Sequence, residues 1–198
     1  MKDNINEVFK YEMYHAKLNL DLDDLQKFSF NLQKNNKGRV RSNIGGWQSN
    51  NLPETDYEEY KNINKLKNEI LKHLDIFSKN FNINKKLTLS NLWININGYK
   101  DSHMVHLHPN SILSGVFYIK TPKNSGSLSF HNPCEDFAEG IFKGNVSSYN
   151  TKNCSIWYFE PQENMLFLFP SFLKHSVGPN MNKTEKRIAL SFNSTWVQ

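Results

Sequence analysis

The sequence predicts a mainly β fold, an antiparallel double-sheet jelly roll with N-terminal helices packed on one outer face. Three observations support this prediction. Residues 1–88 show helical or irregular apolar spacing, residues 89–198 divide into short strand-like runs, and turns separate several of these runs. Short strands at this density are typical of double-sheet antiparallel folds. We expect a single domain over residues 1–198, because no linker or internal repeat interrupts the pattern.

Two helices are expected in the N-terminal part. The first covers Asp21 to Lys34, where apolar residues recur every three or four positions after an acidic start. The second runs from about Thr55 to Lys79, with Thr55 or Asp56 as its N-cap. Because this helix has one apolar stripe on an otherwise charged surface, we expect it to lie against a sheet.

A polar loop with a glycine pair and one tryptophan, residues 42–49, lies between these helices. It can shape a pocket or form a simple turn, and the sequence favours neither. After the second helix, the expected strands occupy residues 89–97, 105–108, 113–120, 127–131, 155–160, 165–169 and 187–196. Alternation places Asn95 and Asn97 on one face of the first strand, and we expect Trp93 and Phe117 to belong to the core.

Composition excludes several classes of protein. The chain is 38% hydrophobic and 22% charged, which is typical of a globular protein rather than a disordered one. The net charge of +5 is spread along the chain in basic runs no longer than pairs, so we do not expect a nucleic-acid partner. No stretch approaches the roughly 20 apolar residues of a membrane span. The two cysteines form no metal-finger or disulfide pattern, so we expect a cytoplasmic protein.

Three of the seven histidines, His103, His106 and His108, fall within six residues. Residues i and i+2 of a strand point to the same face, so His106 and His108 converge. His103 has the opposite parity, and we expect it behind this pair or at the surface. Taken alone, a His-x-His pair is more often two polar strand residues than a metal site. His175 supplies a third imidazole after a later strand, and such a set can build a facial metal site with open positions.

Arg187 opens the last expected strand. A buried arginine is unfavourable unless it meets an anion. A carboxylate bound by both arms of the guanidinium would satisfy it. An ion pair at the surface is the alternative.

Four segments together resemble a known family: residues 42–49, 106–120, 122–133 and 168–177. They are similar to the 2-oxoglutarate/Fe(II)-dependent oxygenase superfamily, in particular to an uncharacterised bacterial and phage branch related to the prolyl 4-hydroxylases. The resemblance implies a double-stranded β-helix (cupin-like) fold. It also implies a dioxygenase that uses Fe(II), 2-oxoglutarate and O2, with ascorbate as an accessory reductant, in a bacterial or phage-infected cell. The substrate would be hydroxylated while 2-oxoglutarate is decarboxylated to succinate.

Carried over by position, the resemblance makes His106, His108 and His175 the iron ligands and Arg187 the residue that binds the distal carboxylate of 2-oxoglutarate. The superfamily usually has Asp or Glu where this chain has His108. Either three imidazoles bind the iron, which we prefer, or a carboxylate comes from elsewhere, with Glu135 and Asp136 the nearest candidates.

Weaker candidates for the co-substrate pocket are Ser114, Tyr118, Asn95 and Ser191. Tyr118 and Ser114 share strand parity and can donate hydrogen bonds to a carboxylate, or they can simply be packed in the core. The stretch from residue 132 to 153 is long and mixed, which favours a lid over the cavity.

Two alternative functions remain from the sequence: a cupin-like metalloenzyme that does not use 2-oxoglutarate, and a non-catalytic metal- or ligand-binding module. The first leaves Arg187 unexplained. The primary substrate is not identified, although kinship to prolyl hydroxylases favours a peptidyl or amino-acid substrate. A homodimer is compatible with the sequence.

Overall fold

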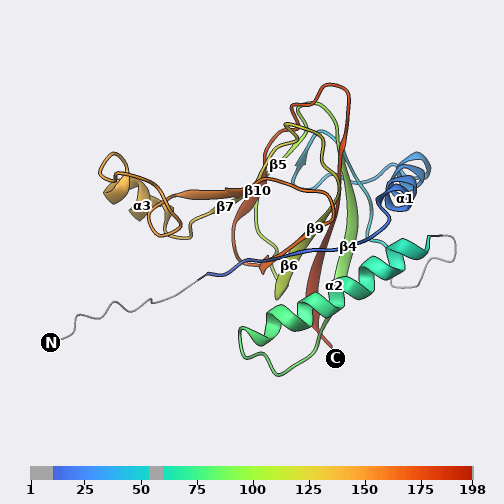
Figure 1. The fold of residues 1–198 in the computed structure, drawn as a ribbon, viewed down its shortest axis with the longest axis horizontal. Helices are drawn as coiled ribbons and strands as arrows, with labels where there is room; N and C mark the ends of the chain where they lie inside the picture. Colours follow the sequence, from blue (N-terminus) through green and yellow to red (C-terminus); the bar gives the residue numbers. More distant parts are fainter. Residues whose placement is uncertain (1–10, 54–59, 198) are drawn as a thin grey trace.

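Two antiparallel sheets face each other in the computed structural model, which describes residues 11–53 and 60–197 apart from the side chains of residues 135–137 (Figure 1). The larger sheet contains, in spatial order, β1 (Tyr14–Lys17), β9 (Met165–Pro170), β6 (Leu113–Lys120), β11 (Arg187–Trp196), β4 (Leu87–Asn97) and β3 (Trp47–Gln48). The smaller sheet contains β2 (Asn43–Ile44), β5 (Ser102–His106), β10 (His175–Val177), β7 (Leu128–His131) and β8 (Ile156–Phe159). This arrangement is the predicted antiparallel double-sheet jelly roll.

Two helices cover the outer face of the larger sheet. In α1 (Leu22–Asn35), the side chain of Asp21 accepts hydrogen bonds from the backbone N–H groups of Asp23 and Asp24, so the acidic start works as an N-cap. Helix α2 (Lys61–Lys79) buries its apolar stripe against the same sheet, as predicted. The predicted start of this helix, with Thr55 or Asp56 as its cap, lies outside the described residues.

Strand parity divides the larger sheet into two faces. Its outer face joins the helices in the main hydrophobic core, which contains the completely buried Ile94, Phe117 and Leu190. Its inner face meets the smaller sheet through a second cluster that includes Tyr118 and Phe167. The expectation that Phe117 belongs to the core is therefore confirmed. Trp93 is buried too, but it lies on the inner face of β4, lines a cavity and belongs to neither cluster.

All seven predicted strands are present, and the differences lie in what connects them. β5 ends at His106, so His108 belongs to the following loop rather than to the strand. The short strands β1, β2, β3 and β10 were not predicted, because segments of two to four residues carry too little periodicity.

The stretch from residue 132 to 153 contains α3 (Glu135–Phe142). Figure 1 shows this helix at the end of an arm that extends away from the two sheets. None of the described residues of this stretch lines the cavity, so in this structure it does not act as the expected lid.

Two broader expectations concern membranes and nucleic acids. Among the residues that the structure describes, no helix has the length and apolar character needed to cross a bilayer.

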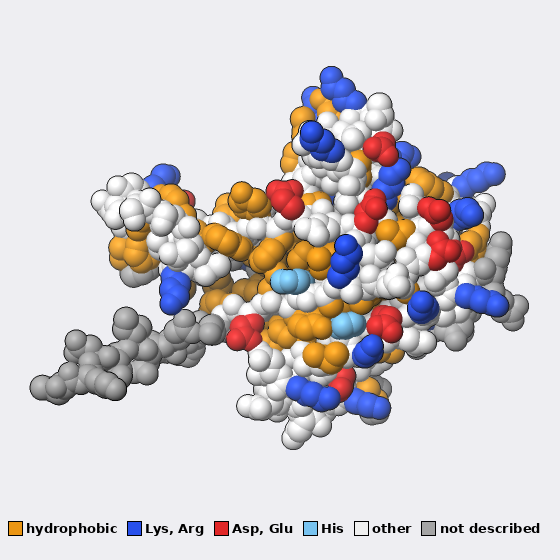
Figure 2. Space-filling model, in the orientation of Figure 1, with side chains coloured by type: hydrophobic (Ala, Val, Ile, Leu, Met, Phe, Trp, Pro, Cys, Tyr) orange, Lys and Arg blue, Asp and Glu red, His pale blue; other side chains and the backbone are white. Residues whose placement is uncertain are grey.

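On the face drawn in Figure 2, Lys and Arg side chains are spread among acidic ones rather than gathered into a basic stripe. Nucleic-acid-binding proteins commonly use such a stripe of basic side chains to contact the phosphate backbone.

Candidate metal centre

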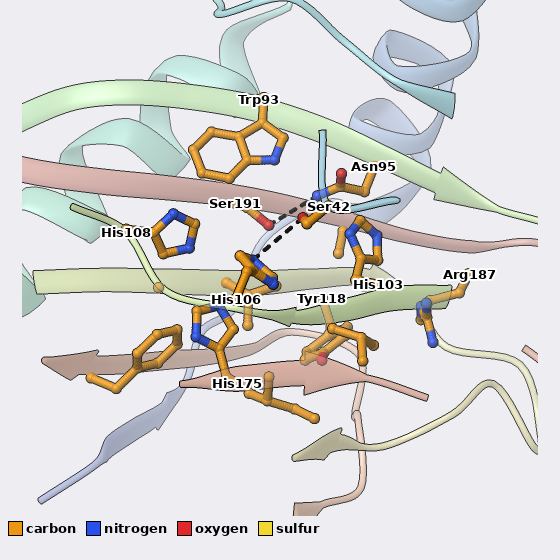
Figure 3. Close-up of a pocket in the computed structure, with 16 residues that line it drawn as sticks. Ser42, Trp93, Asn95, His103, His106, His108, Tyr118, His175, Arg187 and Ser191 are labelled. Carbon is orange, nitrogen blue, oxygen red and sulfur yellow. Dashed lines mark hydrogen bonds between the residues drawn. The ribbon is translucent and has the colours of Figure 1, made fainter. Parts of the chain in front are cut away.

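Three imidazole rings meet at the inner face of the smaller sheet. His106 and His175 are directly paired residues of the neighbouring strands β5 and β10, and His108 follows in the loop after β5. The possible ligand atoms of the three residues all lie within 4.8 Å of one another. Figure 3 shows the rings turned toward a common point. The backbone N–H of His108 donates to the carbonyl of Ser171 at 3.0 Å, which holds the loop in place.

Hydrogen bonds orient two of these rings. The Nδ1–H of His106 donates to the carbonyl of Met104 at 2.7 Å, and that of His175 donates to the carbonyl of Leu173 at 2.9 Å. Because a carbonyl only accepts, the proton of each neutral ring is on Nδ1 and the lone pair is on Nε2. The Nε2 atoms are therefore the donors available to a metal ion.

Burial keeps the rings neutral. It lowers the pKa of His175 to about 3 and, with a smaller contribution from His106, that of His108 to about 4. The pKa of His106 is also lowered by burial, partly offset by its hydrogen bond to Met104. Three neutral imidazole donors at this spacing fit a divalent transition metal such as Fe(II), which takes nitrogen ligands.

The described cluster contains histidines alone and no carboxylate. Glu135 and Asp136, the alternative carboxylate donors considered from the sequence, have side chains outside the described part of the structure. The described residues therefore form a three-histidine site.

A buried guanidinium lies at the far end of the same cavity. Arg187 is 2% exposed, and its Nη1 donates to the carbonyls of Ser125 and, at 3.0 Å, Gly178. Its Nη2 is buried without a hydrogen-bond partner in the described structure, and so is the hydroxyl of Tyr118. Burial raises the pKa of Tyr118 to about 12, so its hydroxyl keeps the proton that it can donate. Two unsatisfied donors on one cavity wall fit a carboxylate as the missing acceptor.

Figure 3 places Tyr118 between the three imidazoles and Arg187. A ligand with a carboxylate at each end would therefore run from the histidines to Arg187 along the cavity. This is the shape and charge of a short dicarboxylic acid such as 2-oxoglutarate.

The other expected pocket residues divide into two groups. Asn95 and Ser191 line the cavity, where the Nδ2 of Asn95 donates to the Ser191 hydroxyl at 2.9 Å and its Oδ1 is buried without a partner among the described residues. Ser114 does not line the cavity. Its hydroxyl is held by Ser171 at 2.7 Å and Asn193 at 2.8 Å, so the structure places it behind the site rather than in it.

The cavity is also lined by residues that were not assigned to the pocket from the sequence, among them Ser42, Trp93 and His103. His103 is buried, and its Nε2 lies 3.3 Å from the Oδ1 of Asn97. The hydroxyl of Ser42 lies 3.4 Å from the Nε2 of His106. Ser42 belongs to the glycine-containing loop, for which pocket formation was one of two open interpretations, and the structure supports that one.

The chain was compared with known protein families, with curated proteins and with solved structures. A sequence family described as "Putative 2OG-Fe(II) oxygenase" matches residues 91–193, the segment that contains all three histidines and Arg187. No match was found among curated proteins.

Solved structures give the same fold. The chain is similar to a Pseudomonas putida prolyl-4-hydroxylase, with a TM-score of 0.62 and 13% identity over 95% of this chain and 94% of the other. It is also similar to the 2OG complex of a viral collagen prolyl hydroxylase from Paramecium Bursaria Chlorella virus-1, with a TM-score of 0.59 and 15% identity over 95% and 97%. HygX from Streptomyces hygroscopicus with nickel and 2-oxoglutarate bound gives a TM-score of 0.63 and 9% identity over 94% and 84%. These likenesses confirm the double-stranded β-helix.

Proposed function

This chain belongs to the 2OG-Fe(II) oxygenase family, which matches more than half of its length, and we propose that His106, His108 and His175 hold its Fe(II) while Arg187 holds its 2-oxoglutarate. The protein is an Fe(II)- and 2-oxoglutarate-dependent dioxygenase that hydroxylates a substrate. One observation carries the residue assignment: three ligand atoms within 4.8 Å of one another share a cavity with an unsatisfied guanidinium nitrogen.

Each proposed residue has a physical role. When bound, Fe(II) provides the redox chemistry by which one atom of O2 enters a substrate C–H bond and the other enters succinate, with release of CO2 from 2-oxoglutarate. His106 and His175 present Nε2 because their Nδ1 protons are held by backbone carbonyls. Arg187 and Tyr118 orient the distal carboxylate. The apolar wall, including Phe169 and Trp93, keeps water out.

The three-histidine set distinguishes this proposed site from the pattern that the superfamily usually has. Replacing an anionic carboxylate by a neutral imidazole removes one negative charge from the ligands. The site then binds Fe(II) through neutral nitrogen donors alone, and the metal keeps a higher net positive charge.

The decisive experiment is turnover of 2-oxoglutarate without an added primary substrate. The purified chain is supplied with Fe(II), ascorbate and 2-oxoglutarate, and succinate is measured with and without N-oxalylglycine as a competitor. We expect succinate formation that N-oxalylglycine inhibits and that His175→Ala abolishes. Metal binding without competition by N-oxalylglycine would instead support a cupin-like enzyme of another reaction type, and no metal uptake would support a non-catalytic module.

For the primary substrate we propose an amino acid or an amino-acid residue in a peptide. Two of the similar structures are prolyl hydroxylases, which supports this class. The fold itself does not choose among substrates, so the choice depends on the surface around the metal centre.

We also propose a homodimer in solution. Within the described residues, β8 is the outer strand of the smaller sheet and exposes Ile156, Trp157 and Tyr158. An exposed apolar edge strand is a surface that proteins commonly cover. Light scattering coupled to size-exclusion chromatography tests this, and a mass of one chain would refute it.

A further inference from the structure

A second hollow, a groove of about 320 Å³, opens beside His106 and His108. It shares Ser42, Trp93, His106 and His108 with the cavity described above, but Arg187 does not line it. The groove therefore reaches the proposed metal site from a side other than the one that holds 2-oxoglutarate. Its volume falls in the range of small-molecule sites, about 300–1,000 Å³.

Two arginines stand on one wall of this groove, on a segment that is fixed to both sheets. The backbone N–H of Arg39 donates to the carbonyl of Gln48 at 2.8 Å, and Gln48 belongs to β3 in the larger sheet. The backbone N–H of Arg41 donates to Asn43 Oδ1 at 2.8 Å, and Asn43 belongs to β2 in the smaller sheet. This double attachment sets the positions of the two arginine backbones relative to the histidines.

The guanidinium of Arg39 is only partly satisfied. Its Nη2 donates to the Oδ1 of Asn51 at 2.9 Å, while its Nε is buried without a partner in the described structure. The group lies 5.9 Å from the centroid of the Trp93 ring. Burial and, to a smaller extent, the nearby charge of Arg41 lower the pKa of Arg39.

No acidic residue lines the groove among the residues that the structure describes, and neither arginine forms an ion pair there. The rest of the lining is rich in side-chain amides, which hydrogen-bond polar groups of a ligand without adding charge: Gln48, Asn51, Asn91 and Asn193. Two positive charges that have no ion-pair partner within the described structure, with a free buried donor and an adjacent indole ring, form a site for an anion attached to an apolar or planar body.

We propose that this groove binds the primary substrate, and that the substrate is a small anionic molecule whose carboxylate or phosphate is held by Arg39 and Arg41. The inference rests on the proposed function. The body of the substrate lies against Trp93, which directs a C–H bond toward His106 and His108. A free amino acid supplies the carboxylate form of this chemistry, and a phosphorylated metabolite supplies the phosphate form.

The test measures anion binding directly. The chain is loaded with Mn(II) and saturated with N-oxalylglycine, so that Arg187 is occupied, and then titrated with inorganic phosphate or acetate. Trp93 lies under Arg39, so tryptophan fluorescence reports binding, and Trp93→Phe identifies the signal that comes from this ring. We compare the wild type with Arg39→Gln/Arg41→Gln and with Lys85→Gln/Lys86→Gln, which removes the same charge from exposed positions outside the groove.

We expect saturable binding of at least one anion, weakened about tenfold or more in Arg39→Gln/Arg41→Gln, which corresponds to the loss of one hydrogen bond to a charged group. The lysine variant should match the wild type. The stronger of the two anions identifies the source, a carboxylate or a phosphate. Absence of saturable binding, or equal affinities in the wild type and the arginine variant, would overturn the inference.

A second measurement separates this inference from the proposed function. Succinate formation is followed with free amino acids, with phosphorylated metabolites, and with an acidic peptide or RNA. Stimulation by the macromolecules alone would overturn the small-molecule assignment. Succinate formation without anion binding would refute this inference alone. Anion binding without succinate formation would refute the proposed function and leave the groove as an anion-binding site without a primary substrate.

Discussion

His106 and His175 are directly opposed residues on neighbouring antiparallel strands, and the centroids of their rings lie 4.3 Å apart. Two imidazoles can lie this close in a buried site only if they remain neutral or share a cation. The centroid of the Phe169 ring lies 4.7 Å from that of His175, and this apolar neighbour further disfavours the protonated, charged form of His175. Two neutral rings at this distance offer lone pairs to a metal ion, which supports the proposed role of the pair as ligands.

The first prediction concerns position 108. His108→Asp introduces the carboxylate that the superfamily usually has there, and its negative charge should keep Fe(II) affinity at or above that of the wild type. His108→Ala removes a proposed ligand and should weaken Fe(II) binding by more than about 100-fold. Losing a residue that only orients a ligand already weakens metal binding by up to about that factor. Isothermal titration with Fe(II) under anaerobic conditions measures both.

The exposed His15 on β1 offers a matched control, because His15→Ala removes an imidazole far along the chain from the proposed centre. Its Fe(II) affinity should equal that of the wild type. Equal affinities for the wild type and His108→Ala would remove His108 from the ligand set.

Arg187 is the subject of the second prediction. Arg187→Lys keeps the positive charge but loses the planar fork, so the KM for 2-oxoglutarate should rise about 10-fold or more, as expected for a lost hydrogen bond between charged groups. Fe(II) affinity should not change, since Arg187 lies at the other end of the cavity. Steady-state succinate formation gives KM and kcat. An unchanged KM in a folded variant would contradict the role in co-substrate binding.

The sequence alone predicted much of this arrangement. Strand parity assigned Asn95, Tyr118 and Arg187 each to one face of its strand, because alternation with period two is a local property of each strand. The structure shows that these residues lie on the inner face of the larger sheet. Parity did not distinguish the parts of that face that pack from those that line a cavity. For this reason Trp93 was expected only as a core residue, whereas it is buried and also lines the site.

Residues that reach the site through loops could not be placed from periodicity. Arg39 and Arg41 come beside His106 only because β2 pairs with β5 and β3 pairs with β4, contacts between segments far apart in the chain. The short strand β10 depends on the same kind of pairing. Long-range contacts of this kind leave no repeating pattern in the sequence itself.

Tyr118→Phe separates co-substrate binding from stability. The Tyr118 hydroxyl is buried without a partner in the described structure, so removing it should stabilise the ligand-free protein by about 1 kcal/mol or more. That corresponds to a rise in Tm of about 2–4 °C for a chain of this size. The same change should raise the KM for 2-oxoglutarate about tenfold, because a hydrogen bond to the carboxylate is lost. A higher Tm with an unchanged KM would identify Tyr118 as a packing residue alone.

The last prediction concerns the pH dependence of stability in the metal-free protein. Burial, with smaller contributions from Arg187 and His106, lowers the pKa of His103 to about 3 from the usual histidine value of 6.5. Below pH 6.5 the unfolded chain takes up a proton at His103 while the folded chain does not, until the pH approaches 3. The free energy of unfolding therefore decreases on acidification through this window, by up to about 1.4 kcal/mol per pH unit from this group.

His103→Asn removes this contribution while keeping a side chain that can hydrogen-bond Asn97. Urea unfolding at pH 6.5 and pH 5 should show a loss of stability about 1.5 kcal/mol smaller in the variant than in the wild type. The other buried histidines titrate in both proteins, so their contribution cancels in the comparison. Should His103→Asn fail to fold at pH 7, His103→Gln provides the same measurement. Equal losses in the variant and the wild type would mean that His103 becomes protonated in the folded state, which would contradict the neutral, buried ring described above.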